Sequence, residues 1–260
     1  MVTLSAGSVD RDRFDRQRRI EWVDMKGIGS ARVLVAGAGA LGNEVVKNLV
    51  LAGFRDIDII DMDDIVPSNL SRCLFFRQSD VKQGMKSDIV ASRASELDPD
   101  ANVRSIVGKI QDLDDWHYDI LIGCLDNILA RMHLNATACG YGIPYVDGAT
   151  DGMMGKIQVV LQGRPCLQCA SNRSHAKALE KRFTCTGSSA VFVPHTASDI
   201  TTTSVIAAME VREAMKIASG RQDLCVEGVT YYDGTAGTMF TLDLETDPEC
   251  PNHLEENQCP

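Results

Sequence analysis

Residues 33–50, VLVAGAGALGNEVVKNLV, place a strand, a glycine turn and a helix in direct succession. The first four residues form a short apolar run of the kind that is buried in a parallel sheet. Gly37, Gly39 and Gly42 follow with G-x-G-x-x-G spacing, and apolar residues then recur at helical intervals. Glycines let a backbone approach a phosphate, and the free N–H groups at a helix start attract its negative charge. The stretch predicts a nucleotide site, which either NAD or ATP would fit.

The composition is that of a globular protein with a full core. The chain has 260 residues, of which 44% are hydrophobic, and its formal net charge of -10 argues against nucleic acid or anionic membrane as partner. No apolar run reaches bilayer length, and the N-terminus lacks the apolar core of a signal peptide. Its nine cysteines include a single C-x-x-C pair, which indicates a reducing compartment, so we expect a cytoplasmic protein.

Strand-like and helix-like segments alternate as far as residue 148. Beyond the glycine turn and its helix, the predicted strands cover 56–61, 103–108, 119–125 and 144–148, and the predicted helices cover 85–97 and 128–142. Such alternation is typical of a mostly parallel sheet with helices on both faces. We therefore expect a Rossmann-like α/β fold.

The pattern changes after Gly148. Residues 156–162 alternate between apolar and polar and indicate an antiparallel extension, to which the predicted strands 228–234 and 238–246 would add. A further helix is predicted over 201–220, with threonines at its start and a glycine at its end. The preceding segment is polar and shows no clear periodicity. We see no repeat and no second domain.

Asp61 ends the second predicted strand, about 20 residues after the last glycine of the turn, where an acidic side chain accepts hydrogen bonds from ribose hydroxyls. Ribose is common to NAD and ATP, so Asp61 supports a nucleotide without choosing one. The alternative is a solvated carboxylate among Asp63 and Asp64. Asp63 joins Asp61 and the three glycines in the predicted cofactor-binding set.

Charged residues at the following strand ends favour ATP. Arg72 and Lys86 come shortly after the ribose-binding strand, where they could offset the charge of a triphosphate. Asp126 follows the apolar strand 119–125 and could hold Mg²⁺ through one bond and several waters. Asn69 could hydrogen-bond a phosphate oxygen or orient Arg72. Taken singly each is more often a surface residue, but together they predict an adenylation site.

The same segments resemble the activating enzymes of ubiquitin-like proteins, from about residue 13 to residue 253. The matching motifs are R-F-D-R-Q (13–17), G-A-G-A-L-G (37–42), I-D-M-D-D-I-V-P-S-N-L-S-R (60–72), Lys86 and C-L-D-N (124–127). The core is also similar to bacterial adenylyltransferases that activate sulfur carriers for molybdopterin and thiamine synthesis. Segments 53–63, 147–156 and 201–217 resemble the catalytic subunit of the eukaryotic activators more closely.

The resemblance implies a reaction between ATP and a ubiquitin-like carrier protein that ends in Gly-Gly. The terminal carboxylate would attack the α-phosphorus, giving an acyl-adenylate and pyrophosphate, with a conjugating enzyme as a further partner. By the resemblance Asp61 holds the ribose, Asn69, Arg72 and Lys86 hold the phosphates, and Asp126 binds magnesium. We expect one adenylation domain over 1–260, divided into a nucleotide-binding half (31–148) and a carrier-binding half (149–260) with a crossover loop at about 166–192.

Arg16 has two interpretations. It lies in the polar segment RFDRQRRIEW, which read alone is a basic solvated helix. In the homodimeric enzymes that the chain resembles, a matching arginine reaches across to the partner's triphosphate. Arg16 beside an otherwise complete site therefore favours a homodimer.

Two cysteine-containing pairs predict a structural zinc site. Cys166-Leu-Gln-Cys169 has the spacing of half a site, and Cys250-Pro-Asn-His253 supplies the second half. The family uses four cysteines, so His253 is a departure from it, and Cys259 is the competing fourth ligand. Zinc bound here would fasten the tail to the crossover loop.

Cys185 is the predicted nucleophile. It stands in R-F-T-C-T-G, where neighbouring cations favour the thiolate, whereas Cys124 and Cys139 fit buried, inert thiols better. The pair Cys185-Thr186 also matches the catalytic Cys-Thr of ubiquitin-like activators, which form a thioester. The chain lacks the large domain that relatives insert around this cysteine, and it has Cys73 where the family usually has glutamine.

The sequence is compatible with four functional hypotheses. The leading hypothesis is a homodimeric, zinc-containing activating enzyme that uses ATP and Mg²⁺ and forms a thioester on Cys185. A sulfur-carrier adenylyltransferase is the alternative, in which Cys185 serves persulfide chemistry or nothing. An NAD-dependent dehydrogenase would leave Asn69, Arg72, Lys86 and Asp126 without roles. A non-catalytic scaffold subunit would lack the phosphate and metal residues that this chain has.

Overall fold

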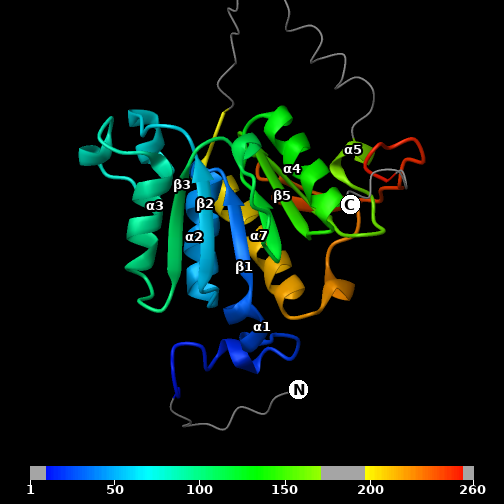
Figure 1. Cartoon of the computed structure of the whole chain (residues 1–260), viewed down its shortest axis with the longest axis horizontal. Coiled ribbons are helices and arrows are strands. Elements are labelled where there is room, and N and C mark those ends of the chain that lie inside the picture. Colours follow the sequence, from blue (N-terminus) through cyan, green and yellow to red (C-terminus); the bar gives the residue numbers. More distant parts are fainter. Residues whose placement is uncertain (1–9, 171–196, 254–260) are drawn as a thin grey trace, which may run out of the picture.

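Five parallel strands and three antiparallel strands share one sheet (Figure 1). The computed structural model describes residues 10–170 and 197–253. Across the sheet the order is β3-β2-β1-β4-β5-β6-β7-β8. The strands are β1 (Arg32–Ala36), β2 (Asp56–Asp61), β3 (Asn102–Val107), β4 (Ile120–Gly123), β5 (Tyr145–Asp151), β6 (Met154–Val160), β7 (Val229–Asp233) and β8 (Thr238–Leu242). Strands β1 to β5 run parallel, and β6, β7 and β8 continue the sheet in antiparallel pairs.

Helices cover both faces of the parallel part. They are α1 (Met25–Ser30), α2 (Ala40–Ala52), α3 (Lys86–Ser95), α4 (Ile128–Tyr141), α5 (Leu167–Ala170) and α7 (Ile200–Ala218). Short 3₁₀ turns are η1 (Gln17–Arg19), η2 (Pro67–Ser71), η3 (Gln78–Asp80), η4 (Ile110–Asp112) and η5 (Gln222–Leu224). The helices within the described ranges are all too short or too polar to cross a membrane.

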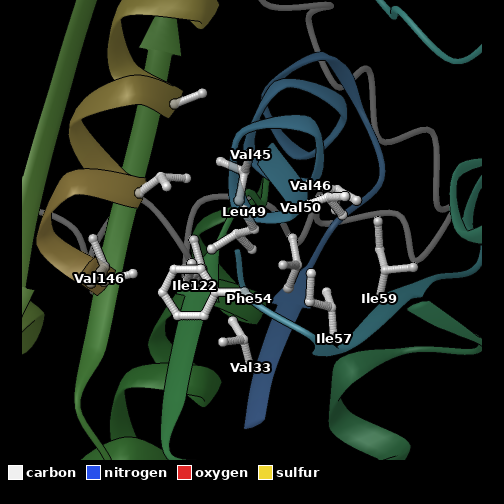
Figure 2. Packing of buried hydrophobic residues seen from close by; sticks show 14 of the residues in the cluster. Val33, Val45, Val46, Leu49, Val50, Phe54, Ile57, Ile59, Ile122 and Val146 are labelled. Carbon is white, nitrogen blue, oxygen red and sulfur yellow. The ribbon is translucent and has the colours of Figure 1, made fainter. Parts of the chain in front are cut away.

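Alternate residues of each buried strand pack into two separate cores. Val33 and Val35 of β1 face the core formed with α2, α3 and α7, while Leu34 and Ala36 face the core formed with α4. Figure 2 shows the first core, in which Leu49 and Phe54 lie among strand residues such as Ile122. Successive strand residues point to opposite faces, so a strand that is apolar throughout needs helices on both sides. The predicted fold class is confirmed.

The predicted elements are found with small shifts at their ends. The largest difference is β8, which ends at Leu242 rather than at residue 246, while β5 continues to Asp151 rather than ending at residue 148. Strand β4 ends at Gly123 rather than at residue 125, because the chain bends there to enter α4. Asn127 caps that helix by accepting a hydrogen bond from the amide of Ala130 at 2.8 Å. Helix α1 was not predicted, although Asp24 caps it in the same way through the amide of Lys26. The segment RFDRQRRIEW, which read alone suggested a basic helix, forms only the short turn η1 directly after Arg16.

The order of the strands determines where a ligand can bind. From β1 the chain moves outward to β2 and β3, then returns to the other side of β1 to form β4. The connections on the two sides leave in opposite directions, which opens a crevice at the carboxyl ends of β1 and β4.

Candidate functional site

Two of the three glycines of the turn are required by close backbone contacts. Gly37 has a φ of 103°, and a Cβ there would lie 2.5 Å from the carbonyl oxygen of Cys124. A Cβ on Gly42 would lie 1.9 Å from the carbonyl oxygen of Gly37. Gly39 differs, because a Cβ there would meet no atom within 4 Å. Two glycines thus permit close packing of the turn, and the third leaves open space at the start of α2.

The carboxylate of Asp61 braces this turn. Its Oδ2 accepts a hydrogen bond from the amide of Ala38 at 2.7 Å, and its Oδ1 accepts one from the amide of Asp63 at 2.8 Å. Burial raises the pKa of Asp61, although both hydrogen bonds oppose that shift. The end of β2 is therefore fastened to the glycine turn before any ligand binds, a role that the sequence did not reveal.

A pocket opens at the predicted crevice. Its lining residues come from the ends of β1, β2, β3 and β4 and from the start of α4: Gly37, Ile60, Asp61, Met62, Asp63, Gly108, Lys109, Ile110, Gln111, Leu125, Asp126, Asn127 and Ala130. The structure thus brings together Gly37, Asp61, Asp63 and Asp126 from the predicted set. Lys109 was missed, although it follows β3 as Asp126 follows β4, so the rule that found Asp126 would also have found it.

Asp126 is exposed on the turn between β4 and α4. Its carboxylate forms no hydrogen bond or ion pair with the described residues, so its oxygens are available to a cation. A single carboxylate with open coordination positions suits Mg²⁺, which keeps several waters. The donor set therefore fits magnesium.

The remaining predicted phosphate ligands do not line the pocket. Lys86 reaches its rim, where its Nζ pairs with Oδ2 of Asp63 at 2.7 Å. The side chain of Asn69 is buried, and its Oδ1 accepts the amide of Val66 at 3.0 Å. Arg72 is half-buried, and its guanidinium donates to the carbonyl of Ser68. Asn69 is thus a cap of the connecting loop here, and the phosphate roles of Asn69, Arg72 and Lys86 stay predictions.

Arg16 lies near the amino ends of the parallel strands, whereas the pocket lies at their carboxyl ends. Its side chain is 83% exposed and pairs with Asp10 at 3.1 Å. The next residue, Gln17, donates to the carbonyl of Ala52 at the end of α2, which is the end remote from the pocket. In Figure 1 this segment lies with α1 below the start of β1. Arg16 therefore lies away from the pocket of its own chain.

Four predicted metal ligands converge. One ligand atom from each of Cys166, Cys169, Cys250 and His253 lies within 4.8 Å of the others. The Sγ of Cys166 is 3.9 Å from that of Cys169 and 3.7 Å from that of Cys250. Nε2 of His253 is buried and has no hydrogen-bond partner among the described residues. Three thiols and an orphaned imidazole nitrogen fit Zn²⁺. Cys259 lies outside the described residues.

Two side chains of helix α4 contact the cluster formed by Cys166, Cys169, Cys250 and His253, which is called the metal cluster below. The Oδ1 of Asn135 accepts the amide of Leu167 at 2.9 Å, which holds the backbone between the first two cysteines. A hydrogen bond from Cys139 lowers the pKa of Cys166 below its ordinary value. Cys139, which the sequence suggested to be an inert thiol, therefore lies against the cluster. Outer partners of this kind orient metal ligands.

Cys185 lies outside the described residues, as do most of the predicted crossover loop and the cations beside Cys185. Of the other cysteines, Cys73 is buried, and burial raises the pKa of its thiol to about 11. Cys124 is also inert by this criterion, because burial raises its pKa.

Comparison with known proteins agrees with this geometry. The ThiF family matches residues 14–252. The chain belongs to the ThiF family. The NEDD8-activating enzyme E1 catalytic subunit of Arabidopsis thaliana is 37% identical in an alignment of 156 positions that covers 53% of this chain and 34% of that protein. The SUMO-activating enzyme subunit 2 of Dictyostelium discoideum is 33% identical in an alignment of 148 positions that covers 55% of this chain and 22% of that protein.

This ThiF-family chain thus aligns with about a fifth to a third of the length of these curated relatives. Among solved structures, MccB of E. coli with ATP superposes with a TM-score of 0.77, covering 94% of this chain and 74% of that one. Their sequence identity is 18%, so this likeness shows a shared fold.

The ThiF-family glycine turn gives a matched pair of variants. Gly42→Ala would force a methyl group against the backbone of Gly37, so we expect a loss of several kcal/mol of folding stability, in the range of severe overpacking. Gly39→Ala has room for its methyl group, so we expect an unfolding temperature near that of the parent but at least tenfold weaker ATP binding, because the methyl group occupies the approach of a phosphate. Thermal unfolding and ATP titration measure the two effects. Equal ATP affinity for Gly39→Ala and the parent chain would contradict this reading of the turn.

The metal cluster makes a second prediction. Chain purified without chelator should contain about one zinc per chain. Cys250→Ser should lose most of this zinc and unfold at a lower temperature, whereas Cys225→Ser, which changes a buried cysteine outside the cluster, should keep it. Elemental analysis and thermal unfolding test this, and a zinc-free parent chain with His253 intact would refute the assignment.

Proposed function

We propose that this chain activates a ubiquitin-like protein by adenylating its C-terminal glycine carboxylate with ATP. The observation that carries the proposal is the pocket at the strand ends. There a glycine turn, the carboxylate of Asp61 and Asp126, which has no ion-pair partner among the described residues, converge, with Lys86 at the rim. Membership of the ThiF family and the likeness to NEDD8- and SUMO-activating subunits support it.

ATP would bind with its phosphates over the amides that begin α2, beside Gly39. Asp61 already holds the turn, and its remaining lone pairs can accept the ribose hydroxyls. Lys86 would exchange its bond with Asp63 for a phosphate oxygen, and Arg72 would turn inward from Ser68. Asp126 would hold Mg²⁺, which neutralises charge on the phosphates.

In the reaction a carboxylate oxygen of the carrier attacks the α-phosphorus, and the bond from that phosphorus to the bridging oxygen breaks. Pyrophosphate leaves with the electron pair of that bond, and the carrier becomes an acyl-adenylate. No proton is transferred in this step. Positioning and electrostatic stabilisation by Lys86, Arg72 and the α2 amides therefore supply the catalysis.

The finer parts of the proposal concern Cys185 and Arg16. We infer that the Cys185 thiolate then attacks the acyl carbon, forming a thioester and releasing AMP. We also infer a homodimer in which Arg16 serves the partner's pocket, because its place at the far edge of the sheet suits a group that acts on another copy. The zinc cluster has a structural role.

A sulfur-carrier adenylyltransferase is the alternative, in which the acyl-adenylate passes to a sulfur donor. The mass of Cys185→Ser after incubation with ATP and the carrier separates the two, because a serine ester would accumulate only if residue 185 accepts the acyl group.

Adenylation itself is tested by isotope exchange. With a carrier ending in Gly-Gly, the chain should move labelled pyrophosphate into ATP. Asp126→Asn should lower the exchange rate by about 10²-fold to 10³-fold, which is the usual loss when a group that stabilises transition-state charge is removed. Glu21→Gln, which neutralises an exposed carboxylate at the opposite edge, should exchange at the parent rate. Full exchange by Asp126→Asn would remove its proposed role.

A further inference from the structure

The metal cluster has one more sulfur beside it than a tetrahedral site can use. Cys166, Cys169, Cys250 and His253 supply the four ligands that complete such a site. The thiol of Cys139 nevertheless donates a hydrogen bond to the sulfur of Cys166. Cys139 is therefore a free thiol in contact with a metal-ligating sulfur, and the proposed reaction at the nucleotide pocket does not use it.

The position of Cys139 on helix α4 explains this contact. Asn135 comes four residues earlier, so the two side chains lie on the same face of the helix. The Oδ1 of Asn135 accepts the amide of Leu167 at 2.9 Å, which places this face against the segment that follows Cys166. Cys139 also packs against the apolar core that contains Cys166 and Cys250. The helix thus holds the sulfurs of Cys139 and Cys166 together.

The other described cysteines outside the cluster lie in a different core. Cys73 and Cys225 are buried on the opposite face of the sheet, and Cys124 packs against that core. Cys139 and Cys169, in contrast, are both partly exposed. Both also contact the sulfur of the buried Cys166, so a small oxidant that reaches either of them lies beside Cys166.

The contact places two reactive partners next to each other. Thiolates are nucleophiles, and hydroperoxides oxidise them to sulfenic acids. A sulfenic acid is captured as a disulfide when a second thiol lies against it. Cys166 contacts a thiol that is not itself a ligand, so this capture requires the loss of only one metal-ligating thiolate.

We propose that Cys139 and Cys166 form a redox switch, in which a hydroperoxide joins them in a disulfide and opens the metal site. With hydrogen peroxide, the Cys166 thiolate attacks one oxygen, the O–O bond breaks, and the departing hydroxide takes a proton from the solvent. The Cys139 thiol then attacks the sulfur of the sulfenic acid, the S–O bond breaks, and the leaving hydroxide takes the thiol proton to form water. The two sulfurs are oxidised, and both peroxide oxygens are reduced to water.

Oxidation removes one of the four ligands. A disulfide sulfur carries no charge, so Cys166 ceases to bind the metal as a thiolate. The three remaining ligands would hold zinc less tightly, and the tail residues 250–253 would be tied less firmly to the segment that follows Cys166. Cys139 lies in the last turn of α4, which ends at Tyr141, so the approach needed for an S–S bond disturbs few helical hydrogen bonds. A dithiol reductant reverses the change.

Zinc release from the full chain tests the switch. Zinc-loaded chain is freed of reductant, treated with an excess of hydrogen peroxide beside a coloured zinc chelator, and mapped by non-reducing peptide mass spectrometry. The parent chain should release about one zinc per chain. It should also yield a peptide pair linked through Cys139 and Cys166. Dithiothreitol with added zinc should restore the metal content and remove the linkage.

Cys139→Ser and Cys139→Ala are the decisive variants. Both should contain zinc as purified, because Cys139 is not a ligand. Both should release zinc at least about fivefold more slowly than the parent in peroxide, because no free thiol captures the oxidised Cys166. Cys225→Ser is the matched control, since it removes a buried cysteine in the other core, and it should release zinc at the parent rate.

Each of several results would overturn the switch. They are a parent chain that has no zinc or keeps it in peroxide, a linkage of Cys166 to a cysteine other than Cys139, and release from both Cys139 variants at the parent rate. Loss of zinc from both variants before oxidation would also overturn it, because Cys139 would then be a ligand. These readouts do not depend on adenylation, so they leave the proposed function untouched.

Discussion

The close approach of the glycine turn to the end of β4 determines the geometry of the whole site. The carbonyl of Gly37 lies where a side chain on Gly42 would be, and the carbonyl of Cys124 lies where a side chain on Gly37 would be. Through these contacts the start of α2 is held against the strand that leads to Asp126. Asp61 adds the end of β2 through its hydrogen bond to Ala38. The glycine turn, Asp61 and the strand end before Asp126 are thus held together by backbone packing and hydrogen bonds without a ligand.

Helix α4 links this pocket to the metal cluster. Its first turn follows Asp126, and its later turns carry Asn135 and Cys139, which hold the backbone and a sulfur of the cluster. The first turn of the helix also provides Arg131, which pairs with Asp147 of β5. One helix therefore contacts the pocket, the chain segment near Cys166 and, through Asp147, strand β5.

Local sequence patterns predicted the fold and much of the site. Apolar runs at period two and amphipathic runs at helical period located nearly every strand and helix, since burial on both faces leaves a clear pattern. The glycine spacing and the two metal-ligand pairs were equally readable, because their chemistry depends on short fixed spacings.

Contacts between distant segments could not be predicted in this way. The sequence could not show that Asn69 caps its own loop, that Asp63 neutralises Lys86, or that Cys139 touches Cys166. Each depends on how side chains from separate elements meet after folding.

The identity of the bound nucleotide is the most direct test of the central claim that the charges around the glycine turn select a triphosphate. Isothermal titration of the parent chain with ATP and Mg²⁺, and separately with NADH, measures it. We expect saturable binding of one ATP per chain and no displacement of ATP by NADH. Tight binding of NADH that displaces ATP would contradict the claim.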